Sequence, residues 1–90
     1  MIKINQLREE VDVLDSQILY LISKRMKLVK ELALQKRKTG FPLVDKKREK
    51  QMINIWMTKA KYLDIEKKSV QHILKEILEM SKEAQSKTIK

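Results

Sequence analysis

Apolar residues recur in alternating steps of three and four along the first third of the chain. They form one stripe, made of Ile4, Leu7, Val11, Leu14, Ile18, Leu21, Leu28 and Leu32. This is the heptad spacing of a long helix that packs along its length against other helices. The position that continues the stripe after Leu21 is residue 25, and it holds an arginine.

Arg25 does not fit the stripe that surrounds it. A guanidinium on the seam of a helix bundle needs an anionic partner, because a buried charge is costly unless it is paired. That partner is either a carboxylate of this protein or an anionic ligand. The choice between the two decides what the protein does.

Two breaks divide the chain into three predicted helices. The first helix is predicted over about residues 4–38, because Gly40 suits a left-handed C-cap and Pro42 prevents the helix from continuing. Asp45 is a good N-cap for a second helix over about residues 46–61. The apolar face of that helix is predicted to consist of Met52, Ile55 and Trp56.

A third helix is predicted over about residues 65–85, with Asp64 as its N-cap. Its inward face is expected to carry Val70, Ile73, Leu74, Ile77 and Met80. Residues 86–90 are polar and are expected to fray.

The composition supports an all-α fold in one domain that covers residues 1–90. The chain has one Gly and one Pro and is rich in Leu, Ile, Lys, Glu and Gln. Ninety residues bury only a modest core, and a first helix of the predicted length would make a single chain open and elongated. We therefore expect obligate oligomerisation.

The net charge of +9 favours anionic partners, which include nucleic acid, an acidic membrane surface and small polyanions. Nucleic acid is not favoured, because the sequence has four aromatic residues, no zinc-finger spacing and no helix-turn-helix pattern. The N-terminal residues do not resemble a signal peptide, and no segment is apolar for long enough to span a membrane. The sequence contains no cysteine, which fits a cytoplasmic protein, and its lone His72 lacks a second ligand for a metal.

Several polar residues share helix faces. Arg25 and Lys36 are eleven residues apart, which is three turns of the first helix, so both point the same way about 16 Å apart. Ser81 and Gln85 are four residues apart on the third helix. Taken singly, Lys36 is expected to lie in a solvated helix end and Gln85 to lie on the surface.

At the start of the second helix, Asp45, Arg48 and Glu49 have a spacing that places them on one face, where they are expected to pair in a tight group. Lys46 and Lys47 lie at the positive end of the helix dipole and are expected to extend into water. Near the other end of the chain, Arg8 is followed by two glutamates and on its own reads as a surface ion pair of little value.

The ordered set of these positions resembles the all-α (AroQ-class) chorismate mutases. The resemblance extends from about Ile4 to Gln85, nearly the whole chain. Its motifs are, in order, Leu7-Arg8, Val11-Asp12-x-Leu14-Asp15, Lys24-Arg25, Lys36, Asp45-x-x-Arg48-Glu49 and Ser81-x-x-x-Gln85. Each piece is unspecific, but the set at these separations is highly specific. The departures that we expect from the family are an unusually lysine-rich surface and no appended regulatory or second catalytic domain.

The resemblance implies the rearrangement of chorismate, a small dianion, to prephenate in aromatic amino-acid biosynthesis, without metal or cofactor. It also implies an intertwined homodimer of three-helix chains in which both subunits contribute to each active site. The roles that it implies concern the two carboxylates, the ether oxygen and the ring hydroxyl of the substrate. Arg25 and the other subunit's Arg8 would pair with the carboxylates, Lys36 and Gln85 would donate to the ether oxygen, and Glu49 would accept from the hydroxyl. Asp45 and Arg48 would lie around Glu49, and Ser81 would support a carboxylate.

The spacing within the first helix agrees with a shared site. Arg8 and Arg25 are seventeen residues apart, about 25 Å along a straight helix, and they point about 100° apart. They can hardly hold one small molecule from the same chain, whereas an antiparallel partner helix would bring the second Arg8 towards Arg25.

Two other functions remain open from the sequence. Isochorismate pyruvate lyase has a similar fold and similar cationic clamps, although Glu49 as a hydroxyl acceptor favours the mutase. A basic helical interaction module is the alternative outside the enzymes, with Arg25 paired to a carboxylate inside a bundle.

Overall fold

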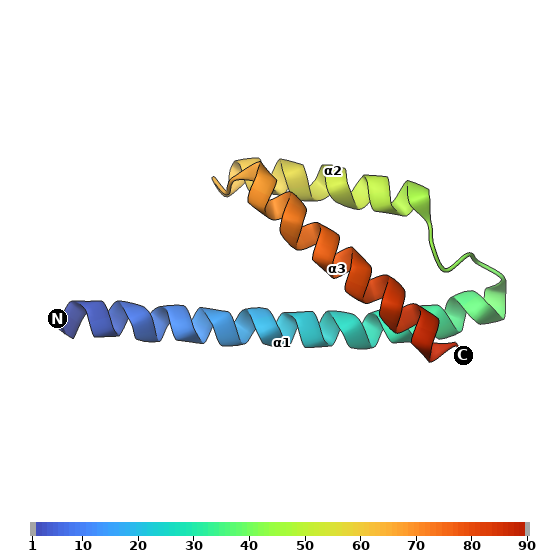
Figure 1. Cartoon of the computed structure of the whole chain (residues 1–90), viewed down its shortest axis with the longest axis horizontal. Coiled ribbons are helices and arrows are strands. Elements are labelled where there is room, and N and C mark those ends of the chain that lie inside the picture. The colour runs from blue at the N-terminus through green and yellow to red at the C-terminus, as the bar shows by residue number, and fades with distance from the viewer. Residues whose placement is uncertain (1, 90) are drawn as a thin grey trace.

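The computed structural model describes residues 2–89 and consists of three helices. They are α1 (Ile2–Thr39), α2 (Lys46–Tyr62) and α3 (Lys67–Thr88). The predicted all-α fold with one long N-terminal helix is therefore confirmed. The N-terminal part of α1 projects well beyond the other two helices (Figure 1). The Cα radius of gyration is 16.5 Å, whereas a compact domain of this length would have about 12 Å.

The break between α1 and α2 has the predicted chemistry. Gly40 follows the last residue of α1 with a φ of 78°, in the left-handed region that favours glycine. Asp45 caps α2, because its Oδ1 accepts a hydrogen bond from the backbone N–H of Arg48 at 3.1 Å.

The break between α2 and α3 corrects one prediction. Asp64 does not cap α3, since it has a φ of 56° and closes α2 instead. The backbone N–H of Asp64 donates to Lys61 O at 3.3 Å, and that of Ile65 donates to Ala60 O at 2.9 Å. This pair of bonds is the Schellman motif, in which the left-handed residue is usually Gly but can be Asp. The segment that we expected to begin α3 is thus used to end α2.

The C-terminal end of α3 also differs from the prediction. The helix continues to Thr88 and does not end at Gln85, so residues 86–88 are helical where fraying was expected. The hydroxyl of Thr88 donates to Ala84 O at 2.7 Å and helps to satisfy the last turn. Lys90 lies outside the described residues.

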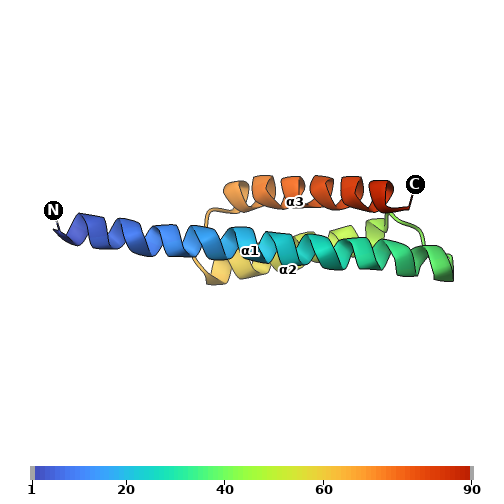
Figure 2. The same cartoon turned by 90° about the horizontal axis from the view of Figure 1, so that it is seen from below.

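Helix α3 is the central element of the fold. Within residues 2–89 it packs against both other helices, whereas α1 and α2 do not contact each other. Figure 2 shows α3 on one side of the layer that α1 and α2 form. The buried apolar residues are few and small, and Ala33, at 0% exposure, lets α3 approach α1 closely. They are Val29, Ala33, Ala60, Val70, Leu74 and Ala84.

The predicted heptad stripe of α1 is not covered within one chain. Its eight residues, from Ile4 to Leu32, are each at least 50% exposed. Helix α1 packs against α3 through Val29 and Ala33 instead. Each of these residues directly follows a stripe residue in the sequence, Leu28 or Leu32. Two residues predicted to face inward on α3, Ile73 and Met80, are also exposed. In the part of the chain that the structure describes, no helix is long and apolar enough to span a membrane.

Candidate active site

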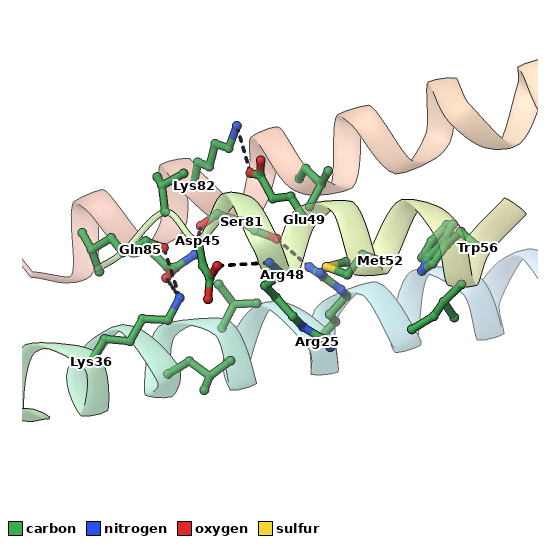
Figure 3. Close-up of a pocket in the computed structure, with 16 residues that line it drawn as sticks. Arg25, Lys36, Asp45, Arg48, Glu49, Met52, Trp56, Ser81, Lys82 and Gln85 are labelled. Carbon is green, nitrogen blue, oxygen red and sulfur yellow. Dashed lines mark hydrogen bonds and ion pairs between the residues drawn. The ribbon is translucent and has the colours of Figure 1, made fainter. Parts of the chain in front are cut away.

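A pocket of about 340 Å³ lies between α1 and α2, with α3 at its back. Its volume suits a small molecule. Charged and polar side chains from all three helices and from the loop before α2 line it (Figure 3). They are Arg25, Lys36, Asp45, Arg48, Glu49, Ser81, Lys82 and Gln85, with Met52 and Trp56 among the apolar lining residues. The pocket therefore brings together seven of the eight predicted site residues.

Arg25 is held by a neutral partner. Its Nη1 donates to the Oγ of Ser81, which is buried and in turn donates to the backbone oxygen of Ile77 at 2.8 Å. Burial, and then the positive charge of Arg48, lower the pKa of Arg25 below its ordinary value. Within residues 2–89 no carboxylate forms a salt bridge with Arg25, so this part of the chain does not supply the anionic partner that the position of Arg25 demands.

Lys36 is also fixed by neutral groups. Its ammonium donates to the Oε1 of Gln85 at 2.9 Å and to the backbone oxygen of Leu43 at 3.1 Å. Gln85 is only 8% exposed, so the surface interpretation of this residue is wrong. The Nε2 of Gln85 makes one long bond, 3.4 Å, to the backbone oxygen of Ser81. This amide therefore has a donor that can move to a better acceptor.

The predicted group of Asp45, Arg48 and Glu49 forms differently from the expectation. Asp45 caps α2 through its side chain, and the Arg48 side chain makes no ion pair with either carboxylate in the described residues. Glu49 pairs instead with Lys82 of α3 at 3.2 Å and weakly with the exposed Lys46 at 3.9 Å. The Asp45 carboxylate is turned to the backbone of its own helix and the Glu49 carboxylate to Lys82, so the predicted pairing with the Arg48 side chain does not form.

Lys82 is the polar pocket residue that the sequence did not indicate. It lies one residue after Ser81 and three before Gln85, on the same side of α3. That spacing could have indicated Lys82 as a pocket residue, but the chain has so many lysines that the position of one of them is not distinctive.

Arg8 is the predicted site residue that the pocket lacks. It is exposed near the N-terminal end of α1 and does not line the pocket. The pocket that a single chain forms is lined by four cationic and two anionic side chains. Such an excess of positive charge suits a small dianion. Among the described residues, no group of three potential ligands could hold a metal ion.

Two comparisons with known proteins give a match. A family model described as chorismate mutase type II matches residues 7–86. A protein named chorismate mutase from Methanocaldococcus jannaschii is 40% identical over 48 residues, which are 53% of this chain and 48% of the relative. The match therefore spans about half the length of that relative. No solved structure matches the chain significantly.

Proposed function

The chain belongs to the chorismate mutase type II family, and on that premise we propose that it catalyses the rearrangement of chorismate to prephenate in aromatic amino-acid biosynthesis. The observation that carries the proposal is that cationic side chains in the pocket lack anionic partners. Arg25, Lys36 and Arg48 line one cavity of about 340 Å³, and none of them has a carboxylate partner within residues 2–89. A dianionic substrate would supply the missing charge.

Each polar group has a proposed role at the substrate. Arg25 and Arg8 from a second subunit bind the two carboxylates, because the guanidinium fork matches carboxylate geometry. Ser81 supports one carboxylate through its contact with Arg25. Lys36 donates to a carboxylate and to the ether oxygen.

The remaining roles concern the ether oxygen and the ring hydroxyl. The Nε2 of Gln85 donates to the ether oxygen, for which its long bond to Ser81 leaves it available. Glu49 accepts from the hydroxyl. Asp45 orients the first turn of α2, on which Arg48 and Glu49 lie, because it caps that turn.

These groups suit a rearrangement that needs no nucleophile and no obligatory proton transfer. The C–O bond breaks ahead of C–C bond formation, so negative charge develops on the ether oxygen. Preorganised donors at that oxygen stabilise the transition state more than the ground state. The carboxylate clamps hold the substrate in its reactive folded conformer.

The proposal includes a homodimer with shared active sites. Two features support it: the exposed apolar stripe of α1, and the separation of Arg8 from the pocket of its own chain. An antiparallel arrangement of two α1 helices would cover the stripe and bring each Arg8 to the other subunit's pocket. A cytoplasmic location stays a prediction.

The direct test is to incubate the purified protein with chorismate and to follow the loss of ultraviolet absorbance without added cofactor. We expect turnover with prephenate as the product. Release of pyruvate with an aromatic acid would indicate the lyase reaction instead, and no turnover would exclude both enzymes.

Shared sites can be tested by mixing Arg8→Ala chains with Arg25→Ala chains. Each homodimer lacks a clamp in both sites, whereas each heterodimer has one site with both arginines and one with neither. Random exchange of subunits should therefore restore about a quarter of the wild-type activity in a twofold-symmetric dimer. If activity stays at the level of the separate variants, sites shared in this way are excluded.

A further inference from the structure

One side of α3 holds three charged side chains that come from the other two helices. Ser81 accepts from Arg25, Gln85 accepts from Lys36, and Lys82 pairs with Glu49. The three α3 residues lie within about 100° of the helix surface. The first two contacts belong to the roles proposed above, and the third has no assigned purpose.

The contact between Lys82 and Glu49 is specific in its geometry. The Lys82 ammonium lies 3.2 Å from Oε1 of Glu49, and the Glu49 side chain is 20% exposed. The second cation near this carboxylate, Lys46, is 3.9 Å from Oε2 and is itself 79% exposed. An exposed pair at that distance contributes little, so Lys82 is the group that fixes the carboxylate.

The pair also links α2 to α3 at one side of the pocket. Glu49 lies in the first turn of α2 and Lys82 in the second half of α3, and both line the cavity (Figure 3). A free glutamate side chain has several rotatable bonds, and ordering it when substrate binds costs conformational entropy. An ion pair that orders it beforehand removes that cost from the binding step.

We infer that Lys82 is a positioning residue for the reaction: it holds the Glu49 carboxylate by one oxygen, Oε1, so that Oε2 is presented to the substrate hydroxyl. The inference rests on the proposed function, because it assumes that Glu49 accepts from that hydroxyl. Lys82 acts through Glu49 and makes no contact with the reacting atoms.

The experiment is a double-mutant cycle on steady-state chorismate turnover, made of Lys82→Met, Glu49→Gln and the combined variant. Methionine keeps an unbranched apolar stem and removes the ammonium. We expect Lys82→Met to lower kcat/KM about tenfold, the usual size of a lost hydrogen bond to a charged group. In the Glu49→Gln background the same change should cost less than about twofold, because the group through which Lys82 acts is already lost.

Two further variants separate positioning from structure. Lys82→Arg keeps a cation within reach of Glu49 and should keep most of the activity. Lys87→Met removes the 2.8 Å ion pair with Glu83 from the exposed side of the same helix and should leave kcat/KM unchanged. Circular dichroism of each variant shows whether the helices are intact. If Lys82→Met is not folded, Lys82→Gln takes its place in the cycle.

The outcomes are distinct. Full activity of Lys82→Met overturns the inference, and so does an equal loss in both backgrounds, which would mean that Lys82 contacts the substrate directly. Absence of turnover in the wild-type protein would instead refute the proposed function, and the two failures are therefore told apart by the first measurement.

Discussion

Arg25 is held by one hydroxyl where an arginine with a structural role in a helix bundle would have a carboxylate. Its pKa is lowered by burial and by Arg48, which means that the folded chain disfavours the charged form. The cost is present in full at neutral pH and declines only as the pH rises from the lowered pKa towards the ordinary pKa of arginine. A bound dianion would offset it, so in the proposed function Arg25 is retained for binding although its charge lowers stability.

The first prediction concerns Arg25→Leu, which removes the charge from the stripe. We expect kcat/KM to fall by about a hundredfold or more, because a preorganised clamp is lost. The midpoint of urea unfolding at fixed protein concentration should be equal to or higher than that of the wild type. Lys27→Leu, on an exposed position of α1, is the control and should keep full activity. A lower midpoint for Arg25→Leu would mean that the arginine stabilises the fold.

The second prediction concerns Gln85→Glu. The Nε2 of Gln85 can donate at any pH, whereas a carboxyl at that position donates only when protonated. The wild-type rate should therefore not need acid, and the rate of the variant should rise as the pH falls. At neutral pH we expect a loss of about a hundredfold. A pH–rate profile of kcat/KM for both proteins is the measurement, and parallel profiles would contradict the role of Gln85.

At the scale of the helices, the chemistry of the caps explains which boundaries the sequence predicts. Asp45 and Asp64 each precede a helical segment, and both are suitable N-caps by residue type. Asp45 follows a loop that Gly40 and Pro42 isolate from α1, so only one interpretation is open. Asp64 lies two residues after the end of α2, where the same side chain also tolerates a left-handed backbone. Residue type does not show whether an aspartate begins one helix or ends the previous one. For Asp64, the backbone hydrogen bonds of the Schellman motif show that it ends α2.

The sequence pattern likewise predicts some of the site residues and not others. Arg25 can be singled out because a charge interrupts an apolar stripe, and Ser81 and Gln85 because their spacing matches a family motif. Lys82 has neither signal, since its partner is 33 residues earlier in the chain and on another helix. Pairings between helices depend on how α2 and α3 pack, which the local pattern does not contain.

The third prediction concerns Gly40 and Asp64, the two residues with a left-handed backbone, for which we expect substitutions to change stability in opposite directions. Gly40 has a φ of 78°, and a Cβ added to it would have no neighbouring atom within 4 Å, so Gly40→Ala meets no clash and only the backbone penalty remains. We expect it to lower the free energy of unfolding by about 1 kcal/mol. Asp64→Gly should raise it by a similar amount, because it relieves a left-handed backbone. Urea titrations measure both, and changes of the same sign would contradict the explanation.

At the scale of the molecule, the small core and the long helix belong together. One chain extends over 57 × 25 × 15 Å, and six apolar residues, three of them alanine, are buried in the part that the structure describes. So little buried apolar surface rarely stabilises a chain of this size on its own. The exposed stripe of α1 is the surface on which the proposed homodimer would complete its core.

The fourth prediction tests that use of the stripe. Leu14→Lys, in the middle of the exposed apolar row, should prevent association and abolish most activity. Sedimentation or size-exclusion measurements report the state of assembly, and circular dichroism reports the helix content. Ser16→Lys adds the same charge to the opposite side of α1 and should leave both assembly and activity intact. Normal assembly of Leu14→Lys would show that the stripe is not the interface.

The position of the stripe on the first helix has a consequence for biosynthesis. Of the three helices, α1 leaves the ribosome first, yet its apolar row stays at least half exposed after the rest of the same chain has folded. In the proposed homodimer, the surface made first is buried last, and only when another chain arrives. A nascent chain with this design is exposed to aggregation for longer than one that closes its own core, and its escape depends on the local concentration of sister chains. Neighbouring ribosomes on one messenger would supply them.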